Sequence, residues 1–173
     1  NMGRIDTEVM YKNVKKWDWK HSKGDFYVDP ETRKNGISFR NSLGRLADEF
    51  IKEKKYDKAE EMLDMAMENM PIEKYGYYRL VIGYIESYYQ IDRPEKARAI
   101  VEFLVNNFQE INHFYGGLSS EEISADFREL EGNLELYRYI IATVQEYDGE
   151  EYTSKLKEDF MASVTVLEKV LEE

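Results

Sequence analysis

The residue types that carry out most enzyme chemistry are scarce in this sequence. His21 and His113 are the only histidines, and neither belongs to a His-x-x-His or Glu-x-x-His pair that would bind zinc from one face of a helix. Cysteine is absent, which excludes disulfides, thiolate-zinc sites and thiol nucleophiles. The sequence therefore predicts no metal site and no cofactor.

Other reactive groups also lack a catalytic arrangement. The run from Gly116 to Ser119 follows no strand and leads into no Gly-Lys-Ser element, so we expect a turn there and not a phosphate loop. No Gly-x-Ser-x-Gly motif is present. The carboxylate pairs Glu60-Glu61, Glu121-Glu122 and Glu150-Glu151 point in different directions on a helix, and we interpret them as solvated charge. We expect no catalytic residue, and hence no enzyme, in this chain.

Tyrosine offers a different chemistry, that of binding. The chain has 14 tyrosines, of which Tyr75, Tyr77, Tyr78, Tyr84, Tyr88 and Tyr89 crowd one predicted helix. These rings either pack between helices with their hydroxyls reaching water, or line a surface that contacts a peptide or another domain at low entropic cost. Both interpretations remain open on sequence grounds.

The elements that must position these residues are predicted to be helical hairpins. Ser38 is the predicted cap of a helix whose apolar residues recur at steps of three and four, and Asp57 is the predicted cap of its partner, which Pro71 ends. The two apolar stripes contain Phe39, Leu43, Leu46, Ala47, Phe50 and Ile51, then Ala59, Met62, Leu63, Ala66, Met67 and Met70. Their order of large and small residues matches the tetratricopeptide pattern, in which small residues allow a close helix approach.

Two further hairpins follow along the chain. The second repeats the first at a spacing of 38 residues, from Ala59 to Ala97, and Pro94 stands in the first turn of its second helix. Residues 106–120 are predicted to be a polar connection, and its last two residues, Ser119-Ser120, also start a long helix that Asp148-Gly149 breaks. The predicted repeats cover residues 38–71, 75–108 and 120–172, and the last is divergent, as expected of a terminal repeat.

The predicted fold is therefore all-α, with about three tetratricopeptide-like antiparallel hairpins in a right-handed superhelical stack. We divide the chain into an N-terminal segment, residues 1–36, and a repeat domain, residues 37–173. The segment has a predicted helix from Thr7, as its cap, to Lys16, and its aromatic residues, Trp17 and Trp19 among them, are expected to dock on the repeats. First helices line the inner surface of such arrays, and they supply a candidate concave binding face of Arg40, Asn41, Arg45, Glu49, Tyr77, Arg79 and Tyr89.

Composition limits the kind of partner. The net charge is −11, from 35 acidic and 24 basic residues, so the domain repels phosphate backbones and anionic lipid headgroups. We expect no nucleic-acid partner. The apolar runs are too short to cross a bilayer, so we expect no membrane insertion by this segment, and the Asn1-Met2 opening suggests a piece of a longer protein.

Several phrases resemble a known family. Gly3 to Thr7, Trp17 to Lys20, Tyr27 to Asp29, Phe39 to Asn41 and Gly44 to Ala47 are similar to the C-terminal soluble region of the bacterial membrane proteins called domain of unknown function 2723, common in Bacteroidetes. Those proteins look like multispanning glycosyltransferases related to protein O-mannosyltransferases. The resemblance implies a soluble domain tethered to a bacterial inner membrane. It favours the extracytoplasmic face of that membrane over the cytoplasmic face.

These observations predict a non-enzymatic interaction or accessory module. Its expected partner is a protein or peptide, including the parent protein's own membrane domain. Two alternatives stay open: a structural or dimerisation domain of the parent enzyme, and a glycan-binding module in which Trp17, Trp19 and tyrosines stack on sugar rings. The oligomeric state does not follow from the sequence.

Overall fold

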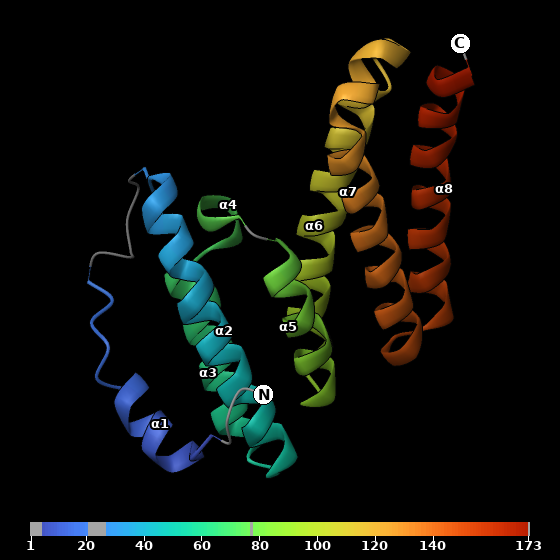
Figure 1. The fold of residues 1–173 in the computed structure, drawn as a ribbon. Helices are drawn as coiled ribbons and strands as arrows, with labels where there is room; N and C mark the ends of the chain where they lie inside the picture. Colours follow the sequence, from blue (N-terminus) through green and yellow to red (C-terminus); the bar gives the residue numbers. More distant parts are fainter. Residues whose placement is uncertain (1–4, 21–26, 77, 173) are drawn as a thin grey trace. The chain divides into compact units, whose positions relative to one another are not determined.

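The structure is a computed structural model that describes residues 5–20, 27–76 and 78–172. Over these residues the chain forms eight α-helices and no strand, which confirms the all-α prediction (Figure 1). They are α1 (Thr7–Val14), α2 (Pro30–Lys52), α3 (Tyr56–Asn69), α4 (Ile72–Tyr75), α5 (Tyr78–Gln90), α6 (Pro94–Tyr115), α7 (Ser120–Tyr147) and α8 (Glu150–Glu172). The chain forms two compact units, Asn1–Ala97 and Arg98–Glu173.

The centre of the first unit is the antiparallel pair of α2 and α3, which lie side by side in Figure 1. Each helix places small and large apolar residues on the face that meets the other, because their spacing of three and four follows the helical period. The fully buried residues of this interface are Leu43, Leu46, Ala47, Phe50, Ala59, Met62, Leu63 and Ala66. The predicted hairpin is confirmed, and Met70 with Pro71 ends α3 as expected. The apolar stripes are confirmed except at Phe39, which is 40% exposed, and at Ile51 and Met67, which are half-buried.

Helix α5 packs against this pair through its tyrosines. The Tyr84 hydroxyl donates to the carbonyl oxygen of Arg40 at 2.7 Å, and the Tyr88 hydroxyl donates to Asp64 Oδ1 at 2.8 Å. Burial raises the pKa of both phenols, so both remain protonated donors. Of the two interpretations that the sequence left open for the tyrosines, packing between helices therefore holds for Tyr84 and Tyr88.

Helix α1 is bound to the pair by polar and aromatic contacts. The Tyr11 ring meets Phe50 edge-on with centroids 5.7 Å apart, and Glu8 accepts bonds of 2.9 Å from Lys55 and Lys58. Asp6 is the N-cap, because its carboxylate accepts from Val9 N–H, so the prediction that Thr7 caps the helix was wrong. The Thr7 hydroxyl instead donates to the Glu53 carboxylate at 3.0 Å.

The N-cap of α2 lies nine residues earlier than predicted, at Asp29 instead of Ser38, and the helix begins at Pro30. Asp29 caps it by accepting from Glu31 N–H and Thr32 N–H, and Pro30 suits the first position because it has no N–H to satisfy. Gly36 does not break the helix. The boundary drawn between residues 36 and 37 therefore lies inside α2, and the first unit includes both sides of it.

The second unit contains the antiparallel pair of α7 and α8, also side by side in Figure 1. Ser119 and Glu122 form a capping box at the start of α7, and the break at Asp148 and Gly149 separates the two helices as predicted. Tyr137 is fully buried, with its ring centroid 6.1 Å from that of Phe108 and 5.1 Å from that of Phe160. These rings join α6, α7 and α8 in one core.

Two local predictions were wrong at helix ends. Helix α6 runs to Tyr115, whereas a connection was expected from residue 106, because Phe108, Asn112 and Tyr115 continue its buried face. Helix α3 begins at Tyr56 without a side-chain cap, and Asp57 stands in its first turn instead of capping it. The remaining connection to α7 is four residues long, 116–119.

Candidate functional site

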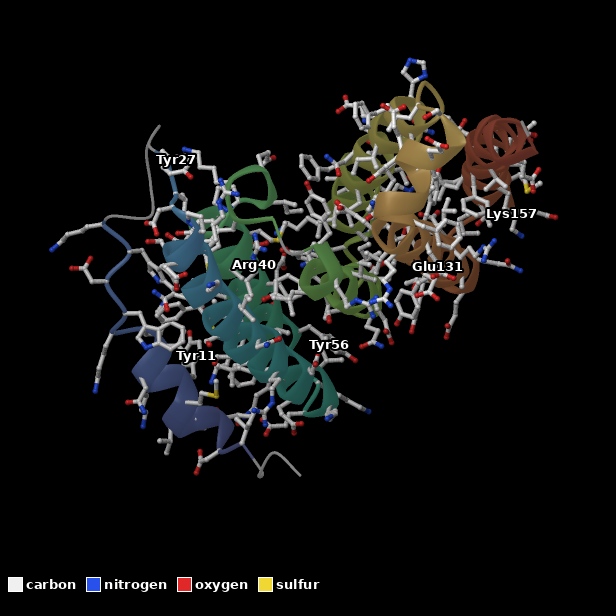
Figure 2. The ribbon with its side chains drawn as sticks, turned by 45° about the horizontal axis from the view of Figure 1, so that its top comes forward. Tyr11, Tyr27, Arg40, Tyr56, Glu131 and Lys157 are labelled. Atoms are coloured by element: carbon white, nitrogen blue, oxygen red, sulfur yellow. The ribbon has the colours of Figure 1, made fainter. Side chains whose placement is uncertain are left out.

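The seven residues of the predicted concave face differ in their exposure to solvent. Arg40 is 1% exposed, and its guanidinium donates to the carbonyl oxygens of Met70 and Gly76, the latter at 2.6 Å (Figure 2). It thereby satisfies carbonyls at the ends of α3 and α4, and burial lowers its pKa. Arg40 is therefore a structural residue of the first unit and offers no surface to a partner.

The other six candidates are dispersed. Asn41 and Arg79 are exposed, Arg45 and Glu49 are half-buried, and Tyr89 is buried. Glu49 pairs with Lys52 of its own helix at 2.6 Å. Tyr77 lies outside the described residues. Asn41, Arg45 and Glu49 are spaced by four residues, so they share one partly exposed polar face of α2, whereas Arg79 lies on α5.

A different hollow in the first unit has the shape of a binding site. We call it the aromatic pocket; its volume is about 370 Å³, and its lining residues are Trp17, Asp18, Trp19, Thr32, Asn35, Gly36, Phe39, Met70 and Tyr75. They come from three segments: the stretch after α1, one face of α2, and the end of α3 with α4. The sequence had indicated that the tryptophans dock, but not that a hollow remains beside them.

Three aromatic rings form one wall of the pocket. Trp17 lies edge-on to Phe39 with centroids 5.0 Å apart, and Trp19 lies 5.8 Å from each of the other two rings. A tight turn after α1 presents the tryptophans, because Trp17 N–H donates to Val14 O and Lys20 N–H donates to the Asp18 carboxylate. Phe39 remains 40% exposed, so part of its ring is open to a ligand.

The floor of the pocket depends on a close contact between helices. A Cβ placed on Gly36 would lie 2.6 Å from Cδ1 of Tyr75, so only glycine lets this ring approach α2 so closely. Tyr75 and Met70 are both buried. Thr32, Asn35, Gly36 and Phe39 share one face of α2 because they are spaced by three and four residues.

The lining residues of the aromatic pocket are mostly apolar. Most of the wall is aromatic or aliphatic, while Asp18, Thr32 and Asn35 supply the polar groups. Such a hollow holds an apolar group and uses a few polar contacts to orient it. Among the described residues, the lining contains no histidine, lysine, arginine or cysteine.

Beyond Trp19 lies a second hollow, which we call the acidic groove. It has a volume of about 500 Å³ and is lined by Trp19, Asp57, Glu60, Glu61, Asp64, Met65, Glu68 and Asn69. Glu60 accepts from Arg93 at 2.9 Å and Lys96 at 2.7 Å, and these bonds lower its pKa. Asp64 binds Lys96, and Glu61 binds Lys15 and the Tyr11 hydroxyl.

Metal binding has no support in the described part of the chain, where no group of three His, Cys, Asp or Glu residues could hold an ion. His113 is exposed near the end of α6 and lines a smaller polar pocket of about 260 Å³ with Gln109, Asn112, Asp159, Ala162 and Ser163. His21 lies outside the described residues.

Comparisons with known protein families, with curated proteins and with solved structures found no match for this chain. Among the helices that the structure describes, none is both long enough and apolar enough to cross a membrane.

Proposed function

We propose that this chain is a non-enzymatic interaction module whose aromatic pocket receives one large apolar side chain of a protein partner. The observation that carries the proposal is the pocket itself, in which Trp17, Trp19 and Phe39 form one wall of an open volume of about 370 Å³. Aromatic side chains are the usual anchors of protein interfaces because they bury much area at little entropic cost.

The expected strength of such a contact follows from the area. An aromatic anchor that buries roughly 150 Å² gains about 4 kcal/mol, before the costs of association are subtracted. A single anchor therefore binds at best near the millimolar range. Physiological binding requires contacts beyond the pocket, so the pocket serves as the anchoring point of a larger interface.

The wider context of the module rests on the repeat pattern and the family resemblance. We propose that the antiparallel pairs are divergent tetratricopeptide-like repeats, which the full burial of Ala59 and Ala97 supports, because the repeat requires small residues at both positions. The resemblance further suggests an accessory domain of a membrane glycosyltransferase-like protein. The partner would then be that protein's membrane domain or its acceptor.

The test uses the intrinsic fluorescence of the protein. Trp17 and Trp19 are its only tryptophans, so tryptophan emission reports directly on the aromatic pocket. Capped heptapeptides of sequence Gly-Gly-Ser-X-Ser-Gly-Gly, with X as Leu, Met or Phe, are titrated to several millimolar. We expect a saturable emission change for at least one of them, and no change with the X = Gly peptide. A linear response for all of them contradicts the proposal.

A blocking variant and a matched control locate the binding. Asn35→Phe places a ring into the pocket from an exposed position of α2, whereas Asn41→Phe adds the same ring on the same helix outside the pocket. We expect the first variant to lose the saturable response and the second to keep it. The reverse result would move the binding surface to the predicted concave face.

A glycan is the second candidate ligand, because Asp18, Thr32 and Asn35 place hydrogen-bonding groups beside two tryptophan rings. Sugar rings bind to sites that combine an aromatic face with such polar groups. Methyl glycosides of glucose and mannose are titrated in the same assay. A saturable response to a glycoside, with none to the peptides, replaces the peptide proposal by a glycan-binding one.

A further inference from the structure

The aromatic pocket and the acidic groove meet at one side chain. Trp19 lines both hollows, and the consecutive residues Asn69 and Met70 line one each. A ligand anchored in the pocket therefore lies beside the groove at the C-terminal end of α3. The groove follows α3 from Glu68 back to Asp57, a length of roughly 16 Å at the rise of an α-helix.

The groove has an excess of negative charge. Among the described residues, five carboxylates line it, those of Asp57, Glu60, Glu61, Asp64 and Glu68. The cations that bind them are Lys15, Arg93 and Lys96. In the described part of the chain no ion pair involves Asp57 or Glu68, which are both exposed at the two ends of the groove.

The charge of the whole chain acts in the same direction. The C-terminal end of α3 adds nothing to the charge of the groove, because the Arg40 guanidinium donates to the Met70 carbonyl oxygen there. The whole chain has a net charge of −11, which favours the approach of cationic ligands over long distances. Anionic surfaces such as phosphate backbones and acidic lipids are disfavoured at this site.

We infer that the partner is a peptide segment with basic residues near its apolar anchor, and that these residues lie along α3 in the acidic groove. This inference rests on the proposed function of the aromatic pocket and names its partner more closely. An extended chain covers roughly 3.4 Å per residue, so the groove accommodates about five residues next to the anchor. The basic residues are therefore expected within five positions of the anchor.

Three peptides test the inference in the fluorescence assay. They share a central phenylalanine and differ only at four alternate positions: Arg-Gly-Arg-Gly-Phe-Gly-Arg-Gly-Arg, and the same sequence with serine or with glutamate in place of arginine. At low salt we expect the arginine peptide to bind about tenfold more tightly than the serine peptide, since each exposed ion pair contributes little alone. The glutamate peptide should bind more weakly than either.

Salt and charge variants separate the two proposals. The advantage of the arginine peptide should shrink at 0.5 M salt, because exposed charges are then screened. The double variant Asp57→Asn with Glu68→Gln should lose most of this advantage, whereas Glu131→Gln, an exposed carboxylate of α7 labelled in Figure 2, should keep it. Circular dichroism verifies that all variants retain their helices.

Each outcome has one meaning. Equal affinities for the arginine and serine peptides overturn the basic-segment inference while the aromatic pocket keeps its proposed function. An advantage that survives in the double variant places the basic residues elsewhere on the surface and also overturns the inference. If none of the three peptides gives a saturable response, the proposed function of the pocket fails as well.

Discussion

The Tyr75 ring lies against the backbone of Gly36 so closely that a Cβ on that residue would be 2.6 Å from Cδ1 of the ring and 3.0 Å from Cε1. This contact fixes the short helix α4 on α2 and makes the floor of the aromatic pocket. It connects the stability of the first unit with its binding site, because any residue that displaces Tyr75 changes both.

Gly36→Ala is expected to destabilise the first unit. The new methyl group forces the Tyr75 ring away at a cost of about 1–3 kcal/mol, most of which remains after the gain of about 1 kcal/mol or less from replacing a helical glycine by alanine. Gly83→Ala in α5 is the matched control, since nothing lies within 4 Å of its Cβ, and it should stabilise the unit. Urea unfolding followed by tryptophan emission measures both. Equal stabilisation by the two variants contradicts the packing argument.

Arg40→Leu is expected to lower the free energy of unfolding by about 2–4 kcal/mol, because the carbonyls of Met70 and Gly76 lose their buried donor. Arg40→Lys should not restore stability, since one ammonium group lacks the two separated donors of the guanidinium. Asn41→Ala, at the exposed neighbouring position, should change stability by less than about 0.5 kcal/mol. A stable, folded Arg40→Leu variant would show that Arg40 is dispensable to the fold.

The docking of α1 is expected to weaken in acid. Hydrogen bonds from Lys55 and then Lys58 lower the pKa of Glu8 from 4.5 to about 2, and a bond from Lys55 also lowers that of Glu53. A carboxylate with a lowered folded pKa contributes its stability above the unfolded value and loses it as the pH falls through the folded value. The contribution of Glu8 should therefore disappear between about pH 4.5 and pH 2.

Tryptophan emission measures this change, because Trp17 and Trp19 follow α1 directly. Glu8→Gln should shift the acid transition of the emission to higher pH, and it should also weaken the dependence of that transition on salt. If Glu8→Gln and the unaltered protein show the same transition, the ion pairs of Glu8 do not hold α1 in place.

Asn112→Leu is expected to stabilise the second unit. Asn112 is 1% exposed on the buried face of α6, near its C-terminal end, and neither polar atom of its amide has a hydrogen-bond partner in the described structure. Replacing an unsatisfied buried amide by an apolar side chain of similar volume removes a cost of about 1–3 kcal/mol. Hydrogen exchange of the α6 amides measures the effect, with Asn106→Leu at an exposed position as the control. Reduced protection in Asn112→Leu would mean that the amide has a stabilising partner.

The local features of the chain were predictable from sequence because each depends on neighbours within a few positions. The apolar stripes of α2 and α3, the proline at the start of α6, the capping box at Ser119 and the break at Asp148 all follow from helical period or from cap chemistry. The observed caps Asp6 and Asp29 accept backbone hydrogen bonds, as the predicted caps Thr7 and Ser38 could also do, and Asp29 in addition precedes a proline. The helix starts were misplaced because several residues near each start could cap the helix.

The candidate site depended on tertiary structure. Arg40 has the sequence context of an exposed helical arginine, and only the return of α3 and α4 across it reveals that its donors are used inside the fold. The aromatic pocket likewise arises where residues 17–19, 32–39 and 70–75 converge. The sequence determines which residues share one side of a helix. Whether a hollow remains between helices depends on the size and position of side chains that are distant in the sequence.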